Sequence, residues 1–254
     1  MNPELCIFHD FEKLSRYAAA LFIEQSNRSI IERDRFLVAL NGGNTPTRLF
    51  QLLATDYRDQ VEWSKVHVFW GDERCVPPDD PESSYGQAQD MLLSRIPILD
   101  SNIHRVKTDL DPAEASRDYS LTLKGFSSPP PDVPRFDLVY LGMGEDGHTA
   151  SLFPGSPVHV TESVIPVTAQ YQDRPANRVS MTQLVFNQAH MIVFMVTGEK
   201  KAITLAEVLS DRYNPEKYPA QRINPKDGEL IWLVDDATAS KLSKKIKGLK
   251  ICEG

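Results

Sequence analysis

The chain has 254 residues, of which 41% are hydrophobic and 25% are charged. This composition excludes a disordered chain, a collagen and a coiled coil, and the length suffices to bury a full core. With 28 basic and 35 acidic residues the formal net charge is −7, so we expect no binding to nucleic acid. A small anionic ligand is still compatible with this charge, because a few local cations and backbone N–H groups can bind one.

The cysteines and the amino terminus bear on the compartment. Cys6, Cys75 and Cys252 are far apart and odd in number, which predicts neither a disulfide framework nor a metal-binding pair. The chain starts without the pattern of a signal peptide, and no apolar stretch approaches the ~18 residues of a membrane helix. We therefore expect a cytoplasmic protein that has no membrane partner.

Short apolar runs alternate along the chain with longer amphipathic segments. The runs predict strands at residues 5–9, 35–40, 66–70, 103–106, 136–141, 164–168, 191–197 and 230–234. The segments predict helices at residues 11–25, 45–54, 84–96, 113–124, 199–209 and 237–245. This order predicts one α/β domain over residues 1–254, doubly wound, with a mostly parallel sheet and helices on both faces. The proline-rich stretch 127–134 is interpreted as a surface loop rather than a linker.

Residues 41–47 follow a buried strand and lead into a helix, with Thr45 as the expected N-cap and Pro46 as the first helical residue. Glycines let the backbone approach a ligand, and the N–H groups of a helix start attract anions. A phosphate cradle and an ordinary tight turn are about equally compatible with this pattern. The candidate binding residues are Gly42, Gly43, Asn44 and Thr45.

Three charged residues, Asp72, Glu73 and Arg74, stand directly beyond the strand at 66–70. A solvated turn is the common interpretation of such a run. The position at the carboxyl end of a strand favours function, because ligands of α/β sheets bind there. Arg74 can bind an oxyanion or a sugar hydroxyl, with Asp72 orienting a neighbour.

Residues 142–155 contain a G-x-G-x-x-G pattern after a strand, but Pro154 and Gly155 interrupt the long helix that a dinucleotide site needs. His148 on this loop is instead placed for proton transfer, and Asp146 is a candidate to fix its tautomer. A histidine that satisfies loop backbone groups is the alternative. Two basic residues at other strand ends, Arg178 and Lys201, are candidates to bind an anion at the same sheet edge.

With these motifs, the chain resembles the 6-phosphogluconolactonase family over nearly its whole length. The family's G-G-S-T-P segment is matched at residues 41–49, with Asn44 where serine is usual, and its D-E-R-x-V-P segment at 70–77. Residues 137–155 are similar to the signature D-x-x-x-L-G-M-G-x-D-G-H-T-A-S-L-F-P-G. Later motifs correspond to residues 178–180, 198–202 and 232–239.

The resemblance implies hydrolysis of 6-phospho-D-glucono-1,5-lactone to 6-phosphogluconate, in the pentose phosphate pathway, without a metal or an organic cofactor. It implies that His148 is the general base and that the phosphate meets the 42–45 loop, Arg178 and Lys201. Arg74 and Asp72 would line the site near the sugar or the phosphate. We expect a monomer or a weak homo-oligomer whose partner is the sugar-phosphate lactone.

Three alternatives compete with this interpretation. A glucosamine-6-phosphate deaminase-like isomerase resembles the chain in the glycine loop and the histidine segment, but such isomerases carry a glutamate where Leu152-Phe153-Pro154 stands here. A sugar-phosphate sensor of this fold would need a DNA-binding segment, which the sequence does not show. A nicotinamide dehydrogenase is disfavoured by Pro154 and Gly155.

Overall fold

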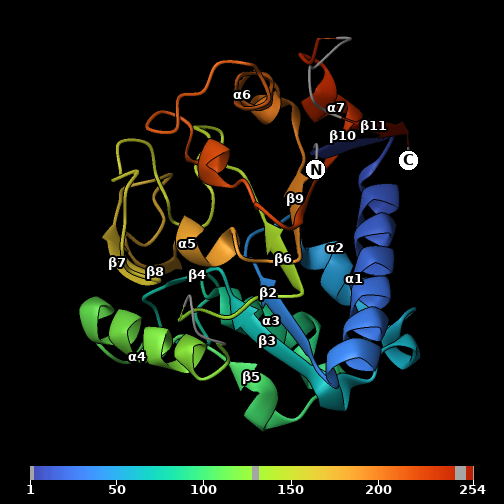
Figure 1. The fold of residues 1–254 in the computed structure, drawn as a ribbon, viewed down its shortest axis with the longest axis vertical. Coiled ribbons are helices and arrows are strands. Elements are labelled where there is room, and N and C mark those ends of the chain that lie inside the picture. Colours follow the sequence, from blue (N-terminus) through green and yellow to red (C-terminus); the bar gives the residue numbers. More distant parts are fainter. Residues whose placement is uncertain (1–2, 128–131, 244–249, 254) are drawn as a thin grey trace.

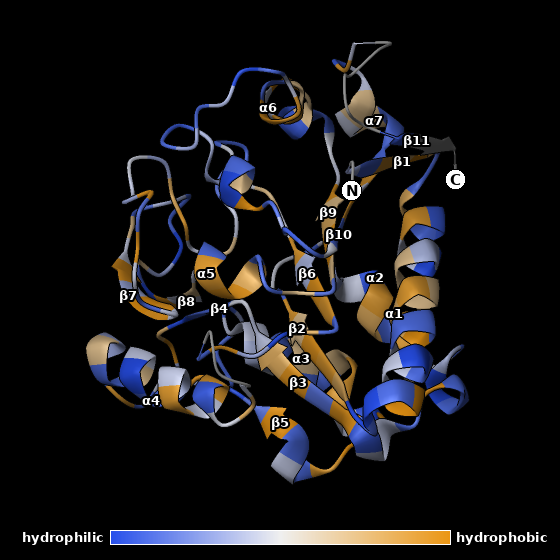
Figure 2. Cartoon of the chain, viewed as in Figure 1, coloured by the Kyte–Doolittle hydropathy of each residue, from blue (hydrophilic) through white to orange (hydrophobic). Residues whose placement is uncertain are grey.

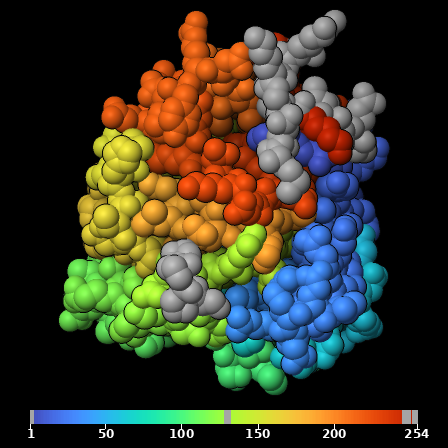
Figure 3. Space-filling view, in the orientation of Figure 1, coloured from blue at the N-terminus to red at the C-terminus, as the bar shows by residue number. Residues whose placement is uncertain are grey.

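The computed structural model describes residues 3–127, 132–243 and 250–253. In these residues a sheet of eight parallel strands has the order β11-β1-β10-β9-β6-β2-β3-β5 (Figure 1). Its strands are β1 (Glu4–Phe8), β2 (Phe36–Leu40), β3 (Val66–Trp70), β5 (Ile103–His104), β6 (Leu138–Leu141), β9 (Met191–Val196), β10 (Glu229–Asp235) and β11 (Lys250–Glu253). Figure 3 shows atoms of the N-terminal and C-terminal parts of the chain, in blue and red, close together on one side of the molecule, which agrees with the pairing of β1 with β10.

Helices cover both faces of this sheet, as the sequence predicts. One face carries α1 (Phe11–Arg33), α2 (Thr47–Ala54) and α3 (Ser84–Met91), and the other carries α4 (Pro112–Lys124) and α6 (Ala202–Val208). Side chains alternate between the two cores along β2, where Val38 packs on the first face and Ala39 on the second. Figure 2 shows the hydrophobic colour concentrated on these central strands. The doubly wound α/β fold is therefore confirmed.

A second, antiparallel sheet stands apart from the first, with the strand order β4-β8-β7. It consists of β4 (Asp72–Arg74), β8 (Asn177–Met181) and β7 (Val164–Thr168), followed by the short helix α5 (Gln183–Phe186). The run at 164–168 is thus a strand, but it does not belong to the parallel sheet. The charged run at 72–74, interpreted above as a loop, is a strand because it pairs residue by residue with β8.

Several predicted boundaries differ from the structure. Helix α1 continues beyond residue 25 to Arg33, and its C-cap, Asp34, has a left-handed φ of 57°. Helix α2 begins at Thr47 with Pro46 in the N-cap position, so Thr45 is not the cap. Helix α7 (Asp236–Ala239) is shorter than the predicted 237–245, of which residues 244–245 lie outside the described part of the chain. The described part also omits residues 128–131 of the predicted proline-rich loop.

The cysteines differ from the prediction in that one of them forms a disulfide. Cys6 is disulfide-bonded, whereas Cys75 is free and half-buried. In the register of β1 and β11, Cys6 stands opposite Cys252. The two residues are distant in sequence, and only the pairing of the edge strand β11 with β1 brings their backbones together.

The chain changes direction across the sheet between β2 and β6. From β2 the strand order runs outward through β3 to β5, and from β6 it runs the opposite way through β9 and β10. At such a switch point the loops after the two central strands diverge and leave a crevice at their carboxyl ends. The loops in question start at residues 41 and 142, which are two of the three loops that the sequence predicts to carry function.

Candidate functional site

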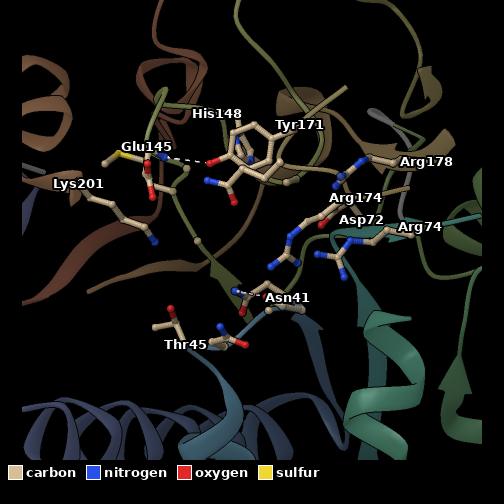
Figure 4. Close-up of a pocket in the computed structure, with 18 of the residues that line it drawn as sticks. Asn41, Thr45, Asp72, Arg74, Glu145, His148, Tyr171, Arg174, Arg178 and Lys201 are labelled. Atoms are coloured by element: carbon tan, nitrogen blue, oxygen red, sulfur yellow. Dashed lines mark hydrogen bonds between the residues drawn. The ribbon is translucent and has the colours of Figure 1, made fainter. Parts of the chain in front are cut away.

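A cavity of about 400 Å³ lies at this switch point. Its walls come from the loops after β2, β6 and β9, from strands β4 and β8, and from the turn between β7 and β8 (Figure 4). Every site residue proposed from the sequence lines it except Asp146, which stands behind His148. The lining residues among them are Gly42, Gly43, Asn44, Thr45, Asp72, Arg74, His148, Arg178 and Lys201.

His148 and Asp146 form a hydrogen-bonded pair. The distance between His148 Nδ1 and Asp146 Oδ1 is 2.6 Å, and the backbone N–H of His148 donates to the same oxygen at 3.1 Å. Burial raises the pKa of Asp146, but the hydrogen bonds and charge of His148 outweigh it, so this pKa is lower than usual. An ionised carboxylate at Nδ1 requires a proton there, which leaves Nε2 of a neutral ring as the basic atom.

The backbone of the 142–150 loop makes room for this pair. Gly147 has a φ of 85° and Ala150 one of 47°, which turns the chain sharply on both sides of His148. A Cβ on Gly144 would overlap the imidazole at Nδ1 and would lie 2.7 Å from Asp146 Oδ1. Gly144 therefore leaves the space that the imidazole occupies.

One wall of the cavity is cationic and poorly paired. Arg178 is only 3% exposed, and its Nε and one Nη have no hydrogen-bond partner. Burial lowers its pKa, and the nearby carboxylate of Asp72 offsets part of this effect. Arg74 donates to the carbonyl of Glu82 at 2.7 Å, but its buried Nε is also unpaired. Buried donors without partners are costly, and an anionic ligand would satisfy them.

Two carboxylates hold this wall in place. Asp72 accepts a hydrogen bond from Ser151 Oγ at 2.6 Å, which ties β4 to the histidine loop. Glu73 is buried and accepts from the backbone N–H groups of Arg74, Ser84 and Tyr85 at 2.7–2.8 Å. Burial raises the pKa of Glu73 in spite of these bonds. The charged run after β3 is thus largely a scaffold that connects β4 to the start of α3.

The glycine loop and Lys201 form another part of the cavity (Figure 4). Gly42 lies so close to Ser84 that a Cβ would overlap its hydroxyl, and Gly43 has a φ of 95°. Burial lowers the pKa of Lys201, an effect that Glu145 and Asp235 partly offset. Together the loop N–H groups and this ammonium provide the elements of a phosphate site.

The sequence predictions missed the turn between β7 and β8. Tyr171, Gln172 and Arg174 all line the cavity, and so does Asn41, whose buried Oδ1 is unpaired. The chain shows no glycine at this turn, and so no local signal set it apart from other polar loops. Among the described residues no cluster of three or more potential metal ligands occurs, and no helix could span a membrane.

Comparison with known proteins identifies the relationship. Residues 9–232 match the family described as glucosamine-6-phosphate isomerases/6-phosphogluconolactonase. The chain belongs to this family. It is 36% identical to the 6-phosphogluconolactonase of Synechocystis over 95% of this chain and 99% of the relative. The crystal structure of a 6-phosphogluconolactonase from Trypanosoma brucei superimposes with a TM-score of 0.83 at 25% identity, covering 95% of this chain and 99% of that one.

Both activities in the family's name are associated with this fold. The structure of a monomeric glucosamine-6-phosphate deaminase superimposes with a TM-score of 0.80 at 20% identity, covering 95% of this chain and 100% of that one. This likeness concerns the fold alone. The choice between the two reactions must therefore come from the side chains around the histidine.

Proposed function

We propose that this chain hydrolyses 6-phospho-D-glucono-1,5-lactone to 6-phosphogluconate, with His148 as the general base. The observation that carries the proposal is the His148–Asp146 pair, set in the same cavity as a cationic wall with unpaired donors. Hydrolysis of a ring ester needs an activated water and stabilisation of the carbonyl oxygen as it becomes negative. This cavity contains side chains suited to both tasks.

In the proposed reaction, neutral His148 takes a proton from water at Nε2 while the water oxygen attacks C1 of the lactone. The carbonyl electrons move onto the exocyclic oxygen, which a cationic side chain or a backbone N–H group stabilises. As the C1–O5 bond breaks, the imidazolium returns the proton to O5 and the open-chain acid forms. Arg74, Arg178, Lys201 and the 42–45 loop divide the binding of phosphate and the reacting carbonyl between them.

The family resemblance and the aromatic packing favour the lactonase over the isomerase. Phe153 packs on the imidazole at 4.5 Å between ring centroids and is buried, where the isomerases carry a carboxylate a few residues past the histidine. A phenyl ring cannot move protons. We therefore expect no ammonia when the protein is incubated with glucosamine 6-phosphate, and its release would favour the deaminase.

The test follows acid release from freshly generated 6-phosphogluconolactone, with the unphosphorylated lactone alongside. The expected result is a strong preference for the phosphorylated compound. In His148→Gln we expect kcat to fall about 10²–10⁴-fold while affinity for the product stays within a few fold, because general-base catalysis contributes on this scale. Unchanged turnover in this variant would eliminate His148 as the base.

We also propose a cytoplasmic location, on the ground that phosphorylated sugars do not cross membranes unaided. The disulfide at Cys6 does not support this location, because disulfides are rare in reducing compartments such as the cytoplasm. Fractionation of cells that carry the tagged protein would test the location.

A further inference from the structure

The turn between β7 and β8 has an unusual backbone. Ala169 N donates to Ala176 O at 3.0 Å, and Arg174 N donates to Tyr171 O at 3.1 Å, which closes a four-residue turn. Both central residues have positive φ, 49° for Gln172 and 55° for Asp173. Type I′ hairpin turns require this conformation, and glycine or asparagine usually supplies it. The turn therefore places residue 171 beside the cavity at a cost in backbone strain.

Tyr171 uses this position to contact the histidine. Its ring meets the imidazole of His148 edge to face, with 4.6 Å between centroids and an interplanar angle of 79°. The phenol oxygen accepts a hydrogen bond from Glu145 N at 3.4 Å, so the ring is attached to the same loop that carries the histidine. Figure 4 shows the tyrosine ring directly over His148.

Phe153 provides a second aromatic contact to the same imidazole. The hydrogen bond that Nδ1–H donates to Asp146 fixes one edge of the ring, but one hydrogen bond leaves the ring free to tilt about that edge. Contacts with Phe153 and Tyr171, at 4.5 and 4.6 Å, restrict this tilt. The direction of Nε2 thus depends on the two aromatic rings as well as on Asp146.

We propose that Tyr171 is a positioning residue for His148, acting through its ring rather than its hydroxyl; this rests on the proposed role of His148 as the base. The ring keeps the imidazole aligned for proton transfer and does not bind the substrate. Misalignment of a catalytic group by about 1 Å can lower a rate 10²-fold. A smaller misalignment should lower the rate by a smaller factor.

The experiment compares Tyr171→Ala, Tyr171→Leu and Tyr171→Phe with the wild type in lactone hydrolysis. We expect kcat to fall about tenfold in the Ala variant with KM within twofold, and at least half of wild-type kcat in the Phe variant. Tyr213→Ala is the matched control, because this tyrosine is exposed and outside the cavity. If the Ala variant is poorly folded by thermal melting, the Leu variant, which retains bulk without an aromatic ring, should show the same fall in kcat.

Several outcomes would overturn the proposal. A rise in KM with unchanged kcat would make Tyr171 a substrate contact, and an equal loss in the Phe and Ala variants would assign the effect to the hydroxyl. Unchanged kinetics in the Ala variant would remove any role. An independent readout is the NMR signal of the His148 ring protons, which should shift in the Ala variant but little in the Phe variant. If the wild type fails to hydrolyse the lactone, the proposed function fails, while this signal still reports whether Tyr171 orients the imidazole.

Discussion

The guanidinium of Arg178 is a buried cation that lacks partners for two of its nitrogens. A charge in this state lowers the stability of the ligand-free protein, and the same unpaired donors make it suitable for binding an anion. The residue illustrates how a site can be costly to the fold and useful for function at once.

Replacing Arg178 with methionine should therefore stabilise the protein and weaken binding. We expect the free energy of unfolding of the ligand-free protein to rise by about 1 kcal/mol in urea titrations, because an unsatisfied buried group costs about 1–3 kcal/mol. KM for the phosphorylated lactone should rise more than tenfold. Arg16→Met is the control, since Arg16 is exposed, lies outside the cavity and pairs with Glu12 at 2.7 Å. Destabilisation of Arg178→Met would show instead that the guanidinium contributes more through packing and its attraction to Asp72 than it costs.

At the scale of elements, the site depends on how short loops leave the strands. The loop after β2 turns through Gly43, and the hydroxyl of Thr47, the first residue of α2, donates a hydrogen bond to Asn44 O at 2.8 Å. This extra turn explains why Thr45 lies in the cavity wall instead of capping the helix. The loop after β6 is similarly compact, and Gly144 gives the imidazole its space.

Gly144→Ala tests this steric argument. The new Cβ would overlap His148 Nδ1, so the ring and its bond to Asp146 must move. We expect kcat to fall about 10²-fold, as displaced catalytic groups do, while circular dichroism remains that of the folded protein. A parallel Gly125→Ala variant alters a helix C-cap outside the cavity and should leave kcat unchanged. Normal turnover in Gly144→Ala would mean that the observed ring position is not needed for catalysis.

At the scale of the whole molecule, the cavity brings together basic residues from the antiparallel sheet and from the turn that precedes α6. Arg178 stands on β8, Arg74 on β4 and Lys201 just before α6, and no two of them are neighbours in sequence. A ligand that bridges these elements binds only the folded chain. Ligand binding should therefore raise the melting temperature.

6-Phosphogluconate at 100 times its Kd should stabilise the protein by about 2.7 kcal/mol, which corresponds to roughly 5–10 °C in a chain of this size. The effect should depend on pH through Lys201, whose pKa burial lowers from 10.5. Below this lowered pKa the ammonium is charged and can bind phosphate. As the pH rises through it the charge is lost, and the stabilisation should decline at a lower pH than for an ordinary lysine.

Differential scanning fluorimetry with and without 6-phosphogluconate, at pH values below and above the pKa of Lys201, measures this loss of stabilisation. Lys201→Arg is the control, because a guanidinium stays charged and should preserve the stabilisation at high pH. A wild-type shift that is as insensitive to pH as that of the arginine variant would exclude Lys201 from the phosphate site.

The alternation of strands and helices, the doubly wound fold and most of the cavity residues could be predicted from local patterns in the sequence. Apolar periodicity reports burial directly, and the position of His148, Arg74 and the glycines after strands places them at one sheet edge. The Asp146–His148 contact could also be predicted, because the two residues are two positions apart in one tight loop.

Features that depend on contacts between distant segments could not be predicted from local patterns and are seen only in the folded chain. The strand at 72–74 exists because it pairs with β8, the disulfide at Cys6 involves pairing at an edge of the sheet, and Tyr171 reaches His148 through a turn that no glycine marks. Local sequence patterns indicate which residues are buried and where the chain turns, because both depend on residues that are close in sequence. Pairing and ring packing between remote residues depend on the relative placement of whole elements, which is settled only when the chain has folded.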